Sequence, residues 1–121
     1  MTKDWTLQDI VDLQRAFQQR LATDPELPHY PRTRTGQLVA NAVLAISEAE
    51  ELLHALPFKW HKRDYLRELT QLELDHVAEE ATDLFIFAIN ALVLLDLDAQ
   101  DIVALVRAKH AVNVERQDGG Y

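Results

Sequence analysis

The chain has 121 residues, which is enough for one domain with a hydrophobic core but too few for two. Its hydrophobic content of 48% is typical of a folded protein and too high for a disordered one. The 20 acidic and 12 basic residues give a formal charge of −8, which disfavours binding to nucleic acid, and the lack of cysteine excludes disulfides and thiolate metal sites.

Few helix-breaking residues interrupt the chain, which contains three glycines and four prolines. This scarcity favours an all-α fold over one of strands and turns. The longest apolar stretch, residues 84–95, is too short to span a bilayer, which needs about 20 residues, and the N-terminus lacks the apolar run of a signal peptide. We therefore expect a single all-α domain over residues 1–121, cytoplasmic and without a membrane partner.

The first predicted helix starts after Thr6, where Thr6 and Asp9 form a helix-capping pattern. One face of this helix is apolar at spacings of three and four residues, except at Gln14. The helical pattern leaves two alternatives for Gln14, because it could be a partly exposed edge residue or a functional one.

A loop is predicted over residues 23–36, because three of the four prolines fall within this stretch. Arg32 and Arg34 are its two arginines. Loop arginines are often simply solvated, but these two could also meet a phosphate.

The second predicted helix covers residues 37–56 and stops before Pro57, because a residue that precedes proline avoids the α conformation. On a helical wheel, Glu48 lies at one edge of the apolar stripe and Glu51 lies just beyond it. Glu50 borders the other edge, so the wheel alone does not decide which of these carboxylates has a function.

A basic and aromatic segment follows at residues 57–63, in an otherwise acidic chain. A short helix is then expected from Asp64. We expect it to break near residues 70–75, where a Thr-x-x-Glu pattern could cap a new helix. The third long helix is predicted over residues 75–95.

This third helix contains the clearest functional signal. Residues 84–95 are apolar on every side except at Asn90, which predicts a position at the centre of a bundle or in a subunit interface. Glu80 and Asp83 lie one turn apart on the face that continues through Phe87. Two carboxylates that point into a core are costly unless they are paired or bind a metal. The alternative is a pair of solvated acids near the start of the helix.

The fourth predicted helix covers residues 99–117, with Asp98 as its N-cap and a glycine pair at its end. Its stripe begins apolar and ends in Lys109, Asn113 and Arg116. Basic residues near a helix C-terminus are favourable in themselves, and their stems can cover apolar surface. These three residues could equally form a clamp for a polyphosphate.

One chemistry would use both the carboxylate pairs and the basic end of the last helix, namely metal-assisted attack of water on a phosphate. Oxygen ligands at positions i and i+3 on two helices suit Mg²⁺ or Mn²⁺. Such ions position a water for in-line attack on a phosphate, while Lys and Arg offset the charge on the leaving group. The sequence contains no Gly-rich phosphate loop and no Ser or Cys nucleophile pattern.

Four segments, in this order, resemble the all-α NTP pyrophosphatases, a superfamily of MazG-like enzymes, dCTP pyrophosphatases and dimeric dUTPases. They are SEAEELL at 47–53, PFKWHK at 57–62, EEATD at 79–83 and KHAVNVERQDGGY at 109–121. The resemblance covers residues 5–121 and implies a four-helix-bundle-like subunit of a homodimer or homotetramer. It also implies hydrolysis of a nucleoside triphosphate to monophosphate and diphosphate, with dUTP as the first choice and dCTP or a purine such as dGTP close behind.

The resemblance assigns a role to each matching residue. It selects Glu51 over Glu50, and Glu51 is also the first candidate for orienting the attacking water. The implied Mg²⁺ ligands are Glu48, Glu51, Glu80 and Asp83. The implied phosphate, sugar and base contacts are Lys59, Trp60, Lys62, Lys109, Asn113, Arg116, Tyr121 and Gln14, with Lys59 and Lys62 beside the reacting phosphates.

Two other functions remain open at this stage. A ferritin-like di-metal bundle uses Glu-x-x-His motifs, and the chain contains two, at Glu51–His54 and Glu73–His76. A non-catalytic acidic helical module that binds a protein partner would also fit the composition.

Overall fold

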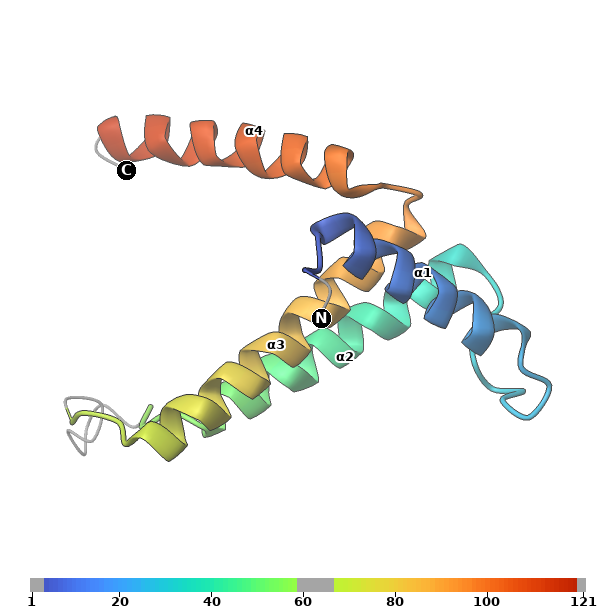
Figure 1. The fold of residues 1–121 in the computed structure, drawn as a ribbon, viewed down its shortest axis with the longest axis horizontal. Coiled ribbons are helices and arrows are strands. Elements are labelled where there is room, and N and C mark those ends of the chain that lie inside the picture. Colours follow the sequence, from blue (N-terminus) through green and yellow to red (C-terminus); the bar gives the residue numbers. More distant parts are fainter. Residues whose placement is uncertain (1–3, 59–66, 120–121) are drawn as a thin grey trace.

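The computed structural model of the protein describes residues 4–58 and 67–119. These residues form four helices, α1 (Leu7–Thr23), α2 (Arg34–His54), α3 (Gln71–Leu94) and α4 (Ala99–Asp118). Helices α2 and α3 run side by side in opposite directions, α1 packs against α3, and α4 extends away from the pair (Figure 1). The prediction of an all-α chain with four helices is confirmed.

Capping side chains fix where three of the helices begin. The side chains of Thr6, Thr70 and Asp98 each accept a hydrogen bond from the backbone N–H three residues later, and the acidic side chain at that position accepts one from the cap in return. This confirms the predicted starts of the first and fourth helices. The fourth helix also ends at a glycine, Gly119, as predicted.

The other two helices begin earlier than predicted. Helix α2 starts at Arg34 rather than at residue 37, because the hydroxyl of Thr33 caps it with a bond of 3.1 Å from the Gly36 N–H. It ends at His54, two residues short of the predicted end. Helix α3 starts at Gln71 rather than at residue 75, because the Thr-x-x-Glu pattern caps it directly. The short helix expected from Asp64 falls mainly outside the described residues.

The loop between α1 and α2 is held by Arg32, which was considered as a phosphate ligand or a solvated side chain. Its guanidinium donates to the carbonyls of Leu21, Ala22, Asp24 and Leu27. Two of these carbonyls lie in the last turn of α1, where they lack partners within the helix. Arg32 therefore caps α1 and closes the loop. Arg34 lies 2.7 Å from a carboxylate oxygen of Asp96.

The hydrophobic core lies where α1, the C-terminal half of α3 and the start of α4 meet. Its buried members are Val11, Ile89, Val93 and Ile102. The turn from α3 to α4 is tight. Asp96 adopts a left-handed conformation (φ 60°), and the Leu97 N–H reaches back to the Leu92 carbonyl over 3.3 Å.

Beyond its first turn, α4 is exposed along its length. Its large apolar side chains include Val106, which is 62% exposed. Helix α2 has a similar face, with Val43 60% and Ile46 70% exposed. Among the described residues, every helix is too short or too polar to cross a lipid bilayer.

Candidate metal centre

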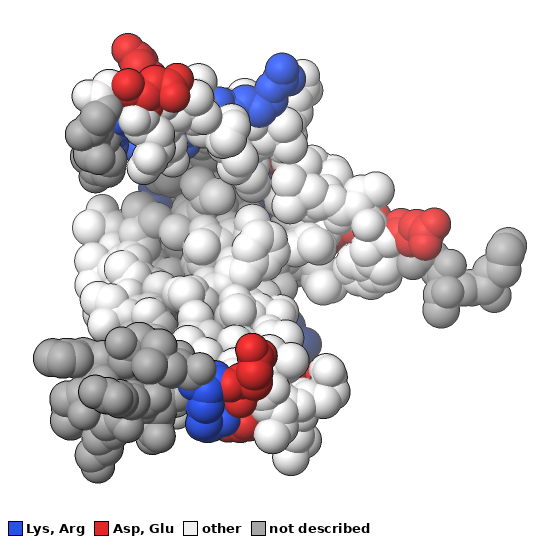
Figure 2. All heavy atoms as spheres, turned by 90° about the vertical axis from the view of Figure 1, so that its left-hand side faces the viewer, with Lys and Arg blue, Asp and Glu red and all other residues white. Residues whose placement is uncertain are grey.

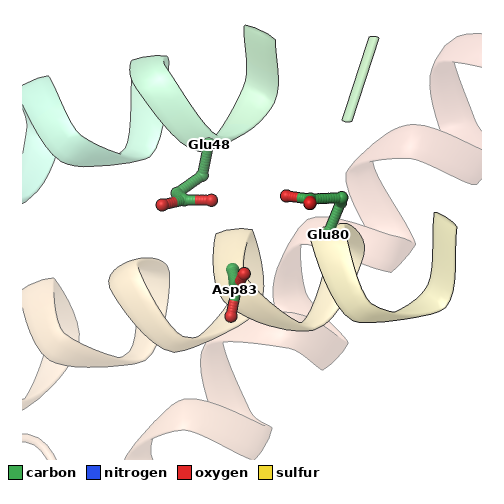
Figure 3. A group of neighbouring side chains, drawn as sticks. All are labelled: Glu48, Glu80 and Asp83. Atoms are coloured by element: carbon green, nitrogen blue, oxygen red, sulfur yellow. The ribbon is translucent and has the colours of Figure 1, made fainter. Parts of the chain in front are cut away.

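Three carboxylates from the two antiparallel helices meet near the middle of the α2–α3 pair. Glu48 projects from α2 toward Glu80 and Asp83 on α3 (Figure 3). Each residue offers one oxygen, and the three oxygens lie within 4.8 Å of one another. We refer to Glu48, Glu80 and Asp83 as the acidic trio. The inward pair predicted on the third helix thus faces a carboxylate of the second helix.

Two oxygens of the acidic trio are buried without a partner. Oε2 of Glu48 and Oε2 of Glu80 have no hydrogen-bond donor in the described part of the chain. The side chain of Glu80 is only 15% exposed, because α2 covers it. Asp83 is more exposed than the helical wheel predicted and borders solvent.

Burial and repulsion make ionisation of these groups unfavourable. Burial raises the pKa of Glu48, and the charges and hydrogen bonds of neighbouring carboxylates raise it further. Burial also raises the pKa of Glu80, with Glu51 and Asp83 adding to the shift, whereas His76 acts in the opposite direction. The trio thus brings three carboxyl groups together at a place where full ionisation is unfavourable unless a cation is bound.

Glu51 lies beside the trio rather than in it. It is exposed on α2, and its oxygens are not among the three that meet within 4.8 Å. It is close enough for its charge and a side-chain hydrogen bond to raise the pKa of both Glu48 and Glu80. Glu51 therefore lies at the solvent-facing edge of the trio.

The donor set fits a hard divalent cation. Mg²⁺ and Mn²⁺ take oxygen ligands, and the buried orphan oxygens of Glu48 and Glu80 supply acceptors that nothing else satisfies. Cluster size alone would not support this assignment, since exposed acidic groups often occur without a metal. The unsatisfied buried oxygens are what distinguish this cluster.

The sequence did not predict that two histidines lie beside the acids. His54 and His76 line a hollow of about 430 Å³ that also contains Glu51 and Glu80. Nε2 of His76 lies 3.7 Å from Oε1 of Glu80. The spacing of four residues within one helix could have revealed this pair, but these histidines were considered only as parts of Glu-x-x-His motifs.

The ferritin-like alternative loses one of its ligands. Glu73 accepts two hydrogen bonds from Arg67, at 2.7 and 3.0 Å, and one from the Thr70 backbone N–H. The Arg67 and Thr70 bonds lower the pKa of Glu73 to about 2. Glu73 thus stabilises the start of α3 and points its oxygens at these donors, away from a metal role with His76.

Of the remaining candidate residues, those that the structure describes are not gathered around the trio of their own chain. Lys109, Asn113 and Arg116 are exposed on α4, which leaves the α2–α3 pair (Figure 1). Gln14 is half-buried on α1. Four further predicted residues lie outside the described part of the chain: Lys59, Trp60, Lys62 and Tyr121.

Comparison with known proteins gives one match. A family model described as phosphoribosyl-ATP pyrophosphohydrolase matches residues 10–110. No curated protein and no solved structure is significantly similar to the chain. The matched range includes all three residues of the acidic trio and most of α4.

Proposed function

Because the chain belongs to the phosphoribosyl-ATP pyrophosphohydrolase family, of the MazG-like all-α NTP pyrophosphatase superfamily, we propose that it is a divalent-metal-dependent nucleoside triphosphate diphosphatase. Members of this family are pyrophosphohydrolases of nucleotide-like substrates. The observation that carries the proposal is the acidic trio, with its two buried and unpartnered carboxylate oxygens. The reaction would release a nucleoside monophosphate and diphosphate.

Glu48, Glu80 and Asp83 would hold Mg²⁺, with Mn²⁺ as a substitute, and Glu51 would complete the set at the solvent side. When bound, the ion would offset the negative charge of the phosphates and lower the pKa of a water molecule for the attack. The residues contribute position, because the packing of α2 on α3 brings the three oxygens within 4.8 Å of one another. They also contribute charge, because their mutual repulsion favours the metal-bound state over the empty one.

Glu51 is our candidate for orienting the attacking water. It is exposed at the edge of the trio and lines the same hollow as Glu80. A carboxylate in this position can accept a proton from water while the buried carboxylates remain engaged. Lys59 and Lys62 are proposed to act on the phosphates, on the basis of the resemblance alone.

The basic end of α4 is proposed to serve the acidic trio of a second copy of the chain. Lys109, Asn113 and Arg116 lie on the exposed part of α4, so they cannot clamp a phosphate at their own trio without a large movement of the helix (Figure 1). A homodimer or homotetramer in which α4 covers the α2–α3 pair of a neighbour would bring them there.

The exposed surface supports such an assembly. The chain exposes 9368 Å², whereas a compact monomer of 13.9 kDa exposes roughly 6,700 Å². The excess is comparable with the area that each subunit buries in an obligate dimer, about 1,000–2,500 Å². In Figure 2, the surface between the charged groups at the top and bottom of the view is mostly uncharged.

The substrate class follows from the resemblance and from the family match. Our first choice is dUTP, with dCTP or a purine nucleotide such as dGTP next. The family description also names phosphoribosyl-ATP, which carries a triphosphate and is therefore a further candidate. Each of these substrates would be cleaved between the α and β phosphates.

Product analysis tests the proposal directly. The purified protein is incubated with each dNTP, each NTP and phosphoribosyl-ATP, in Mg²⁺, in Mn²⁺ and in EDTA. We expect monophosphate and diphosphate from one substrate class, with no turnover in EDTA. Absence of cleavage of every substrate with both metals would overturn the proposal. Release of orthophosphate instead of diphosphate would overturn the assigned reaction.

A further inference from the structure

The turn between α3 and α4 is held by side chains from α1 and from the start of α2. Helix α4 leaves the rest of the chain at this turn and is exposed beyond its own first turn (Figure 1). Among the described residues, its main packing partner is α1, which it contacts at its base. The direction of α4 therefore depends on few interactions, and they lie at or near the turn.

Two residues of α1 form hydrogen bonds with the backbone of the turn. Oε1 of Gln8 accepts a bond of 2.9 Å from the N–H of Ala99, the first residue of α4. The guanidinium of Arg15 donates a bond of 3.1 Å to the carbonyl of Leu97. The Ala99 N–H is one of the donors at a helix start that have no partner within the helix. Gln8 therefore caps α4 from a different helix.

Asp12 connects these two side chains on α1. Nε2 of Gln8 donates a bond of 2.8 Å to Oδ1 of Asp12, one turn further along the helix. The same oxygen lies 3.5 Å from Nη1 of Arg15. Because the bonds from Gln8 and Arg15 to the turn are partly buried, water competes less for them than for a surface contact.

The contact from α2 to the turn is weaker. Arg34 pairs with Asp96 at 2.7 Å, but the two side chains are 60% and 77% exposed. Exposed ion pairs are screened by water and contribute little. The two bonds from α1 should therefore have the larger influence on the direction of α4.

The length of α4 amplifies any change at its base. From Ala99 to Arg116, at ~1.5 Å per residue, the helix spans about 26 Å. Over this length, a rotation of roughly 10° at the turn would move Arg116 by about 4–5 Å. A hydrogen bond to a phosphate oxygen requires a separation of about 2.7–3.2 Å, so a movement of this size would break it.

We propose that Gln8 and Arg15 are positioning residues for the proposed diphosphatase reaction. They fix the direction in which α4 leaves the subunit, and so hold Lys109, Asn113 and Arg116 at the acidic trio of a second copy. The inference rests on the proposed function, in which these three residues bind the phosphates of the substrate. Gln8 and Arg15 act through α4 and not on the reacting atoms.

Distances between spin labels measure the direction of α4. The chain contains no cysteine, so Leu72→Cys and Ala111→Cys provide one label on α3 and one on α4, both at exposed positions. Co-refolding with an excess of unlabelled chain restricts the signal to pairs within one chain. Arg15→Met and Gln8→Met should shift or broaden the distance distribution by several ångströms, and the double variant should do so most. An unchanged distribution in the double variant would overturn the proposal.

Kinetics and metal binding show what this shift does to the site. Arg15→Met and Gln8→Met should each raise the KM for the nucleotide about 10-fold, because phosphate contacts are lost. Binding of Mn²⁺ to the acidic trio, followed by EPR of the free ion, should match the wild type. Arg15→Lys should return the KM most of the way to the wild-type value, because lysine can also donate to the Leu97 carbonyl. Equal losses in Mn²⁺ binding and in KM would indicate general damage to the fold and contradict the proposal.

Two control variants lose the same chemical groups elsewhere. Arg20→Met removes a positive charge from an exposed position of α1, and Gln100→Met removes an exposed amide from α4. Both should leave the label distances and the KM unchanged. The two proposals fail in different ways. A wild type that cleaves no nucleotide overturns the proposed function, whereas an active wild type whose Gln8 and Arg15 variants keep the same KM overturns only their positioning role.

Discussion

The two halves of α3 differ in the side chains that they bury. The C-terminal half buries Ile89 and Val93 in the hydrophobic core and ends in a turn whose backbone bonds are made. The N-terminal half is capped by Thr70, and it then presents Glu80 and Asp83 to a third carboxylate from α2. In the C-terminal half, the buried oxygen without a donor is the neutral amide oxygen of Asn90. In the N-terminal half it is a carboxylate oxygen of Glu80, which lies beside a second such oxygen from Glu48.

This difference shows which half maintains the fold and which is built for a ligand. Packing of apolar side chains stabilises the chain whether or not a ligand is present. Grouped carboxylates destabilise the empty protein, and this unfavourable energy is relieved when a cation binds. Changes in the two halves should therefore separate stability from activity.

The largest effect should come from Glu80→Gln. The amide keeps the size of the side chain but removes the charge that would hold the metal, so kcat should fall on the order of 100-fold or more, a loss of several kcal/mol of transition-state stabilisation. The free energy of unfolding without metal should be unchanged or higher, because charge repulsion in the trio is reduced. Steady-state kinetics and denaturant unfolding of the same preparation measure both quantities.

Glu79→Gln is the matched control for this variant. Glu79 is the preceding residue on α3, is exposed and lies outside the acidic trio. Both variants lose one negative charge, so a general effect of net charge would appear in both. Equal losses of activity would contradict a specific role for Glu80.

Ile89→Ala should lower the stability of the protein and leave its activity almost unchanged, the reverse of what is expected for Glu80→Gln. Ile89 is 3% exposed in the core, and truncation of such a side chain lowers the free energy of unfolding by about 2–5 kcal/mol. Activity per folded molecule should change little at low temperature. Leu72→Ala, at a position that is 80% exposed, should stay within about 0.5 kcal/mol of the wild type. Denaturant unfolding at one protein concentration compares the two, and equal costs would contradict the assignment of the core.

The sequence was most informative where local chemistry decides the structure. The caps at Thr6 and Asp98 were predicted because a side chain and its backbone partner lie three residues apart. The start of α2 was missed because three prolines outweighed the capping hydroxyl of Thr33, which lies just beyond them. The start of α2 is thus set by the capping residue Thr33 and not by the prolines of the preceding loop.

The candidate site was predictable in part. Glu80 and Asp83 could be selected because their helix is otherwise apolar, whereas Glu48 and Glu51 needed the family pattern. The direction of α4 could not be predicted, because it depends on which helices meet in three dimensions.

The smallest expected effect is the pH dependence of the metal-free protein. Raised pKa values mean that the folded state holds protons on Glu48 and Glu80 that the unfolded state has released. The contribution of these groups to stability should therefore fall as pH rises from their ordinary value of 4.5 until both are ionised. Mg²⁺ should reverse the loss above this range, by about 2.7 kcal/mol at 100 times its Kd.

Unfolding in EDTA and in Mg²⁺ across this pH range, compared with Glu80→Gln, measures the effect. Both proteins of this comparison also carry His76→Gln, because Nε2 of His76 lies 3.7 Å from Oε1 of Glu80. The two proteins then differ only in the carboxyl group of residue 80. The free energy of unfolding should fall less steeply with pH in Glu80→Gln than in the protein that keeps Glu80. The increase in this free energy on adding Mg²⁺ should also be smaller, because both effects arise from repulsion between the same carboxylates. An identical slope in the two proteins would mean that carboxylate repulsion in the N-terminal half of α3 does not destabilise the metal-free protein. The proposed difference between the two halves of α3 would then be wrong.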